Sequence, residues 1–350
     1  MLTIYEQAEQ WRQEAKPVAC ATVVSTFGSS PQPVGAKMFV TIGGEMVGSV
    51  SAGCVESSVA QTAQEVLREQ KPRLIKFGVS GEQAAEIGLA CGGEIEIYLE
   101  PVPALSQDEL FHNVIQFIRS RKIFATCTII NGLGFGKKWF FSPNSSPIGD
   151  TEPPPLLDLI GGEVEKVWAT QQPVRKKITT AGGESELFID CYPPPPRLII
   201  IGAVHIAIPL IAMAKMLGFY TIVIDARAIF ATRERFPHAD ELIKAYPPDI
   251  LRQMKLDEGS YVVTLTHDEK FDNPSLAEVL KYPVRYVGAL GSSRTHQKRL
   301  QSLSEAGVPQ HLLARIHAPV GLDLGSRTPE EIALEIIAEM TAVRRGISAK

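Results

Sequence analysis

The sequence predicts an α/β protein with an N-terminal α+β domain, residues 1–193, and a C-terminal domain with a doubly wound parallel sheet, residues 194–350. At 350 residues the chain is longer than one hydrophobic core usually holds. Four consecutive prolines, 193–196, form a stiff extended connector, and the domain boundary is placed there. Before it the strand patterns come in hairpins, whereas after it strand and helix patterns alternate, which is typical of a parallel sheet.

The composition is that of a soluble globular protein, with 45% hydrophobic and 21% charged residues. A net charge of -4 gives no electrostatic reason to expect nucleic acid or an anionic membrane as a partner. The first fifteen residues lack the basic and apolar segments of a signal peptide. Residues 198–224 are apolar, but glycine, proline and lysine interrupt them, so we expect no membrane span.

The five cysteines form an odd set without a C-x-x-C pair, namely Cys20, Cys54, Cys91, Cys127 and Cys191. This pattern predicts reduced thiols and a cytoplasmic protein.

The N-terminal domain is expected to begin with an amphipathic helix at 5–14 and a strand at 17–26, followed by a loop rich in glycine, serine and proline at 27–35. Gly43 and Gly44 predict a two-residue hairpin, because both can take positive φ. The remaining core motifs, within residues 18–101, are a helix from about Cys54 to Glu69 and strands at 73–77 and 94–99.

The second part of this domain is expected to contain a helix, several strands and a proline-rich loop. Ser106 and Glu109 have the spacing of a capping box that opens a helix to about Arg119. The predicted strands are 125–131, 138–142 and 186–191, and the predicted loop is 151–156. No internal repeat is apparent in the sequence.

The C-terminal domain opens with a strand, a glycine turn, a helix and a second strand within residues 197–227. This is the first βαβ unit of a Rossmann-like, dinucleotide-binding fold. Free N–H groups after Gly202 favour an anion, and Asp225 lies where a ribose hydroxyl would be held. Val204 replaces the second glycine of the fingerprint and would obstruct a pyrophosphate, so the sequence does not favour ordinary NAD binding.

Ligands of open parallel sheets bind beyond the carboxyl ends of the strands, and four loops of this domain qualify. Small residues, hydroxyl groups and a cation at 291–294 suit a phosphate. A structural role for His205 is as consistent with the sequence as a ligand contact. The candidate binding residues are Gly202, His205, Asp225, Arg227, His267, Asp268, Gly291, Ser292, Arg294, His317 and Asp323.

Cys54 is the first candidate for reactive chemistry, because it follows Gly53 at the start of a helix, where the dipole favours a thiolate. Cys91, beside glycines, is the second. For either, the alternative is a small buried hydrophobic residue. Ser29 and Ser30 could bind an anion, although turn formation explains them equally well. A reactive thiol suits a soft metal centre or sulfur transfer.

Several segments together resemble the XdhC/CoxI family of xanthine dehydrogenase accessory proteins. They are GSSPQPVGAKM (28–38), GSVSAGCVE (48–56), CGGEIEIYLEP (91–101), IIIGAVHIA (199–207), VIDARAIFATRERFPHAD (223–240), TLTHDEKFDNPSL (264–276), YVGALGSSRTHQKRL (286–300) and HAPVGLDLGSRTPEEIALEIIAEM (317–340). Two departures stand out. Val204 and Ala52 each replace a glycine of the family's pattern, and the second matters only where position 52 needs positive φ.

The resemblance implies a cytoplasmic homodimer that binds molybdenum cofactor, assists its sulfuration and delivers it to a molybdenum hydroxylase such as xanthine dehydrogenase. It implies a cofactor chaperone rather than an enzyme, with a cysteine desulfurase as a further partner. It assigns Cys54 to cofactor handling, including a contact to molybdenum, and places Gly202, His205 and Asp225 in the Rossmann crevice.

Two other functions remain open from the sequence. One is an NAD(P)-dependent oxidoreductase with Asp225 on the ribose, which favours NAD over NADP, and His267 or His317 as the acid–base residue. The other is a scaffold that docks a partner enzyme without holding the cofactor.

Overall fold

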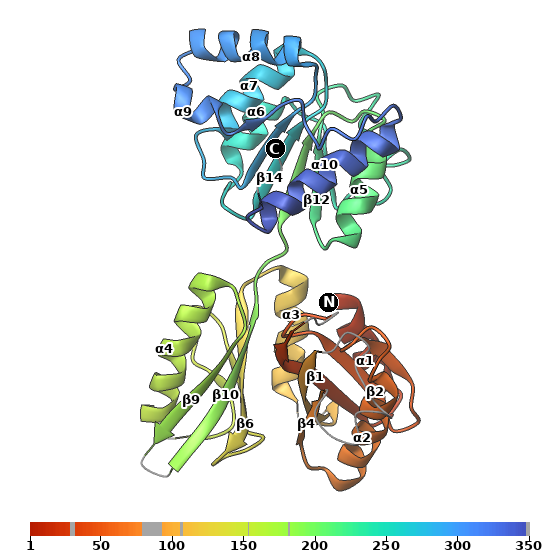
Figure 1. The fold of residues 1–350 in the computed structure, drawn as a ribbon, viewed down its shortest axis with the longest axis vertical. Helices are drawn as coiled ribbons and strands as arrows, with labels where there is room; N and C mark the ends of the chain where they lie inside the picture. Colours follow the sequence, from red (N-terminus) through yellow and green to blue (C-terminus); the bar gives the residue numbers. More distant parts are fainter. Residues whose placement is uncertain (29–31, 79–92, 106–107, 153, 181–182, 348–350) are drawn as a thin grey trace. The chain divides into compact units, whose positions relative to one another are not determined.

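Two antiparallel sheets, each covered on its outer face by one helix, make up the N-terminal unit, residues 1–194 (Figure 1). The computed structural model describes residues 1–28, 32–78, 93–105, 108–152, 154–180 and 183–347. The first half of this unit comprises α1 (Leu2–Gln13), β1 (Val18–Phe27), β2 (Lys37–Thr41), β3 (Met46–Gly48), α2 (Glu56–Glu69), β4 (Arg73–Phe77) and β5 (Glu94–Val102). The second half comprises α3 (Glu109–Ser120), β6 (Phe124–Gly132), β7 (Lys138–Phe141), β8 (Ile148–Gly149), α4 (Pro154–Thr170), β9 (Val174–Thr180) and β10 (Gly183–Tyr192).

The two halves are an internal repeat. Both sheets have the same strand order, β3-β2-β1-β5-β4 and β8-β7-β6-β10-β9, and both halves place helices at the same points of the chain. The bulge at Val24 of β1 recurs at Ile130 of β6. Our expectation that the chain has no internal repeat was therefore wrong. The shared sequence signal is short, G-x-K-x-F at 35–39 and again at 136–140.

Side chains alternate between the two faces of each sheet because successive residues of a strand point in opposite directions. In β1, Ala19, Ala21 and Val23 join the apolar core beneath α2. Their counterparts in β6, the residues 125, 127 and 129, join the core beneath α4. The other face of each sheet is turned toward the opposite sheet, so the N-terminal unit has a layer of side chains between its sheets.

Two local predictions for this unit were wrong, and a third was right only in part. The cap of α3 is Asp108, whose carboxylate accepts the N–H of Phe111, and not Ser106. The segment expected to be a proline-rich loop instead begins α4 at Pro154, because proline is tolerated in the first turn of a helix. The hairpin predicted at Gly43 and Gly44 is present between β2 and β3, but of its two glycines only Gly44 has a positive φ.

The C-terminal unit, residues 195–350, has one parallel sheet with helices on both faces. Its strands are β11 (Arg197–Ile201), β12 (Tyr220–Ile224), β13 (Glu241–Ile243), β14 (Ser260–Thr264), β15 (Tyr286–Ala289) and β16 (Ile316–His317). Its helices are α5 (Ala207–Met216), α6 (Pro247–Gln253), α7 (Glu269–Val279), α8 (Ser293–Glu305), α9 (Gln310–Leu313) and α10 (Pro329–Arg344).

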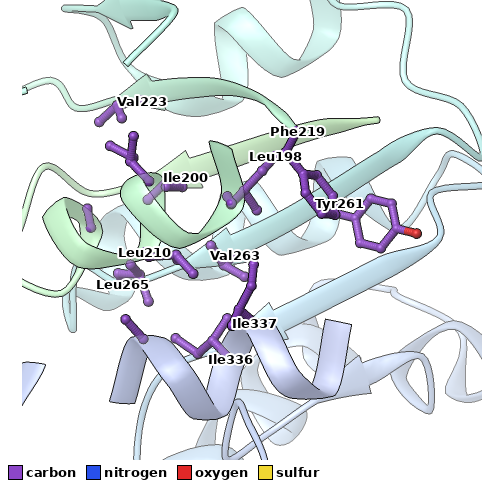
Figure 2. Close-up of a cluster of buried hydrophobic side chains, with 14 of the residues drawn as sticks. Leu198, Ile200, Leu210, Phe219, Val223, Tyr261, Val263, Leu265, Ile336 and Ile337 are labelled. Atoms are coloured by element: carbon purple, nitrogen blue, oxygen red, sulfur yellow. The ribbon is translucent and has the colours of Figure 1, made fainter. Parts of the chain in front are cut away.

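The strand order is β13-β12-β11-β14-β15-β16, so the topological switch lies between β11 and β14. Helices α5 and α10 cover one face of the sheet, where Leu210, Ile336 and Ile337 pack against strand residues (Figure 2). Helices α6 to α9 cover the other face. The fold class is confirmed: an α+β unit is followed by a Rossmann-like unit. Within the described residues, no helix is both long and apolar enough to span a bilayer.

Candidate functional site

The switch point of the parallel sheet is formed by the loops that follow β11 and β14. Gly202, at φ +113°, ends β11 and lies against Thr266, since a Cβ built on Gly202 would be 2.9 Å from the Thr266 methyl group. Helix α5 begins only at Ala207, whose N–H donates to Val204. His205, between them, is exposed. Gly202 therefore serves the contact between two loops, and the helix begins five residues after Gly202 rather than directly after it.

Asp225, at the end of β12, is buried, and its carboxylate already accepts several hydrogen bonds. The Ala203 N–H donates to Oδ2 over 2.8 Å, and the guanidinium of Arg227 donates to both oxygens over 2.8 and 2.9 Å. Burial alone would raise the pKa of Asp225, but the bonds from Arg227 and Ala203 hold it below its usual range. Arg227 in turn lies over the ring of Phe230, 4.6 Å from its centroid. A ribose at Asp225 would have to compete with Arg227.

The loop after β14 carries His267 and Asp268, and the two have different surroundings. His267 is exposed and adopts a left-handed conformation, with φ of 59°. Asp268 caps α7, because its carboxylate accepts the N–H of Lys270 over 2.9 Å. Asp272, one turn into α7, is buried and accepts the hydroxyl hydrogen of Thr266 over 2.7 Å.

The loop predicted to bind phosphate, 291–294, opens α8. Ser292 caps this helix by accepting the N–H of Thr295, and Arg294 is exposed. The cation beneath the loop is instead Arg299, which is 4% exposed and donates to the carbonyl of Leu290. Its Nη2 lies 3.8 Å from Asp272, and its Nε and Nη1 have no hydrogen-bond partner among the described residues. Burial lowers the pKa of Arg299.

His317, at the end of β16, belongs to a buried network centred on Glu339 of α10. Glu339 accepts from the Tyr286 hydroxyl over 2.5 Å, from the Gly321 N–H over 2.8 Å, and lies 2.9 Å from His317 Nδ1. Burial alone would raise the pKa of Glu339, but hydrogen bonds from His317 and Tyr286 lower it to about 2. The ionised carboxylate only accepts, so His317 Nδ1 carries a hydrogen. Asp323, six residues further, is exposed.

In the N-terminal unit, the loop before α2 presents Cys54 to solvent. Helix α2 begins at Glu56, two residues after the cysteine, and the Glu56 carboxylate folds back into the loop. It accepts the N–H groups of Val50, Ser51 and Gly53 over 2.8–3.2 Å, together with the hydroxyl hydrogens of two serines, Ser49 and Ser51. Burial alone would raise the pKa of Glu56, but these bonds lower it to about 2.

This arrangement changes the interpretation of the Cys54 loop. The N–H groups of Val50, Ser51 and Gly53 bind the Glu56 carboxylate and are not free for a thiolate. Ala52, which replaces a glycine of the family's pattern, does take a positive φ, 59°, so the position tolerates alanine under strain. Among the four described cysteines, Cys54 alone is exposed. Ser29, Ser30 and Cys91 lie outside the described residues.

Sequence reasoning missed four charged residues of these sites: Glu56, Asp272, Arg299 and Glu339. Each is an ordinary helix residue by its sequence context. Burial distinguishes Asp272, Arg299 and Glu339, whereas Glu56 is distinguished by the loop N–H groups that its carboxylate accepts. A cluster of three or more His, Cys, Asp or Glu residues that could hold a metal ion is absent from the described part of the chain.

Two family models match the chain. The model described as XdhC Rossmann domain matches residues 198–340, and the model described as XdhC and CoxI family matches residues 11–78. A relative from Bacillus subtilis, named as a probable subunit of xanthine dehydrogenase, is 28% identical over 340 residues, covering 96% of each chain. The molybdenum cofactor insertion chaperone PaoD from Escherichia coli is 27% identical over 342 residues, covering 98% of this chain and 88% of PaoD.

A solved structure is similar over both units. It is the crystal structure of a xanthine dehydrogenase from Bacillus halodurans, with 28% identity and a TM-score of 0.77, covering 98% of this chain and 96% of that one.

Proposed function

Because this chain belongs to the XdhC and CoxI family, we propose that it binds molybdenum cofactor as cargo, assists its sulfuration and inserts it into a molybdenum hydroxylase of the xanthine dehydrogenase type. The similarity to PaoD supports the proposal, because it extends over 98% of this chain and PaoD is named a molybdenum cofactor insertion chaperone. The observation on this chain that carries it is the exposed thiol of Cys54 on a loop that Glu56 holds in shape.

The donor chemistry of this loop fits the metal end of the cargo. A thiol is a soft ligand and a sulfur nucleophile, and molybdenum held by a dithiolene is a soft centre. The exposure of Cys54 makes it accessible to a large cofactor, whereas Cys20, Cys127 and Cys191 are buried. Burial raises the pKa of these three thiols, which disfavours their thiolate forms.

The C-terminal unit is proposed to bind an anionic group at its switch point. Candidate contacts there are Gly202, His205, Arg227 and the loop that opens α8. The buried Arg299 beneath that loop supports this assignment, because two of its guanidinium nitrogens, Nε and Nη1, have no partner among the described residues.

We further propose that the protein acts in the cytoplasm as a homodimer, and that a cysteine desulfurase supplies the sulfur for sulfuration of the cofactor. The four described cysteines are free thiols, as expected of a reducing compartment. Light scattering of the purified chain measures its oligomeric state, and a monomer at working concentration would contradict the dimer.

Cofactor transfer tests the main proposal. The purified chain is loaded with molybdenum cofactor released from a donor enzyme, separated from free cofactor, and mixed with apo-xanthine dehydrogenase. We expect the wild type and Ser57→Ala to restore activity, and Cys54→Ser to lose most of this transfer. Ser57 is a matched control because it is exposed three residues further along the same segment. Full transfer by Cys54→Ser removes the thiol from the mechanism, and no cofactor retained by the wild type refutes the function.

A further inference from the structure

The layer between the two sheets of the N-terminal unit contains two ion pairs that the internal repeat relates to each other. Lys37 Nζ lies 2.8 Å from Asp190 Oδ2, and Lys138 pairs with Glu100. The strand register shows that the two lysines are equivalent, and so are the two carboxylates. Lys37 lies opposite Thr22 in the first half, and Lys138 lies opposite the equivalent residue, 128, in the second. Likewise, Glu100 lies opposite residue 20, and Asp190 lies opposite the equivalent residue, 126. Each pair therefore joins the lysine of one half to the carboxylate of the other.

A cavity of about 610 Å³ lies between these sheets, within the size range of small-molecule sites. Its walls include the aromatic rings of Tyr5, Phe39, Phe111, Tyr98, Phe135 and Tyr192. Its polar lining includes Lys37, Glu100 and Lys138, so carboxylate and ammonium groups stand side by side. Phe135 and Asp150, both exposed lining residues, place its mouth at the surface.

One hydroxyl in this cavity lacks a partner. Tyr98 is 2% exposed and lines the cavity, and its hydroxyl oxygen makes no hydrogen bond to any described residue. A Cβ built on Gly136, another lining residue, would lie 3.9 Å from this oxygen. In contrast, the hydroxyl groups of Tyr5 and Tyr192 bond to each other over 2.9 Å. The Tyr98 hydroxyl is therefore a polar group of this cavity for which a bound molecule can supply the hydrogen-bond partner.

The internal repeat sharpens this argument. Tyr98 stands opposite Thr22, and the residue in the same register of the second half is Phe188. Phe188 is 3% exposed and packs in the same small cluster as Tyr98. A phenylalanine ring therefore packs well at the equivalent position, and Tyr98 differs from it only by the hydroxyl group.

We propose that this cavity binds a fused ring of the pterin class, with the Tyr98 hydroxyl and the Glu100–Lys138 pair on its polar edge. A pterin edge carries an amino group and a ring N–H beside a carbonyl oxygen. The carboxylate of Glu100 accepts from the two N–H donors, and Lys138 donates to the carbonyl oxygen. Aromatic walls suit the faces of such a ring. The choice of a pterin rests on the proposed function, because molybdenum cofactor contains one.

Binding of neopterin, followed by quenching of its fluorescence, tests this inference on the full chain. We expect saturable binding by the wild type, about three- to tenfold weaker binding by Tyr98→Phe, and a comparable or larger loss in Glu100→Gln. Tyr98→Phe should also unfold at an equal or higher temperature than the wild type, because it removes an unpaired buried hydroxyl. A merely structural role for Tyr98 predicts the opposite, a lower melting temperature and unchanged affinity.

Tyr282→Phe is the matched control, since the Tyr282 hydroxyl bonds to Glu278 in the other unit. No neopterin binding by the wild type, or equal binding by the wild type, Tyr98→Phe and Glu100→Gln, overturns the inference. A second measurement, the retention of whole molybdenum cofactor by the same variants, distinguishes the proposed function from the proposed pterin site. Wild type that retains cofactor independently of Tyr98 keeps the proposed function and refutes this site. Wild type that binds neopterin through Tyr98 but retains no cofactor keeps the site and refutes the function.

Discussion

Lys37 Nζ and Asp190 Oδ2 are 2.8 Å apart in the interior of the N-terminal unit, and both side chains are less than 10% exposed. Lys37 also donates to Thr22 over 3.0 Å. Burial alone would lower the pKa of Lys37, but the charge of Asp190 raises it well above the usual range. The related pair, Lys138 and Glu100, is less buried, with 26% and 13% of the side chains exposed.

Removal of Lys37 should therefore lower the free energy of unfolding more than removal of Lys138. Lys37→Met leaves Asp190 as an uncompensated buried charge, and we expect it to lower the free energy of unfolding by about 3–5 kcal/mol. Lys138→Met, its equivalent in the repeat, should cost about 1 kcal/mol because solvent screens the remaining carboxylate. Urea unfolding at pH 7 measures both. Equal losses would contradict the difference in burial.

The contacts of Asp225 predict weak binding of NADH. Arg227 and the Ala203 N–H already occupy its carboxylate, so we expect no micromolar binding in calorimetric titrations of the wild type. Arg227→Ala uncovers the carboxylate and should bind NADH more tightly than the wild type. Arg345→Ala, which removes an exposed cation at the end of α10 away from these loops, is the control. Micromolar binding by the wild type would instead favour an oxidoreductase.

The Glu339 network predicts a specific dependence of stability on pH. The pKa of Glu339 is lowered from 4.5 to about 2, so the stability it contributes is complete above about pH 4.5 and is lost as the pH falls toward 2. Glu339→Gln cannot accept all three hydrogen bonds and should lose about 2 kcal/mol at pH 7. Urea midpoints at pH 7, 5 and 3 should converge for the wild type and this variant. The exposed Glu305→Gln should follow the wild type throughout.

The Cys54 loop should lose its shape without the Glu56 carboxylate. Glu56→Gln removes the negative charge of the carboxylate that accepts hydrogen bonds from the N–H groups of Val50, Ser51 and Gly53. We expect hydrogen exchange in peptides spanning residues 49–55 to become faster, by about tenfold. Glu65→Gln, on the exposed face of the same helix, should leave this segment unchanged. Protection that persists in Glu56→Gln would show that other contacts fix the loop.

Much of the fold could be predicted from local patterns. The sequence T-P-E-E at 328–331 predicts a helix start with Thr328 as its cap, and the structure contains this capping box with Glu331, because it depends only on neighbouring residues. The strands around Gly202 follow from buried, β-branched runs. Helix α4 was missed because its prolines suggested a loop, although proline fits a first helical turn.

The sites were less predictable because they depend on contacts between distant segments. Glu339 is separated by 22 residues from His317 and by 53 from Tyr286, and no local spacing joins them. Cys54 was identified from its turn, but the carboxylate that fills that turn comes from the following helix. The polar layer between the sheets was also missed. Its one sequence signal was Asp190 within an otherwise apolar strand, 187–192.

The repeated halves of the N-terminal unit make its interior nearly symmetric, because each lysine of one half meets a carboxylate of the other. Two identical halves would present the same groups on both sides, so a ring bound between them would have two equal orientations. Tyr98 and Phe188 occupy equivalent positions and make the two sides chemically different. Under the proposal above, a single polypeptide with unlike halves can select one orientation of its ligand, which a symmetric pair cannot.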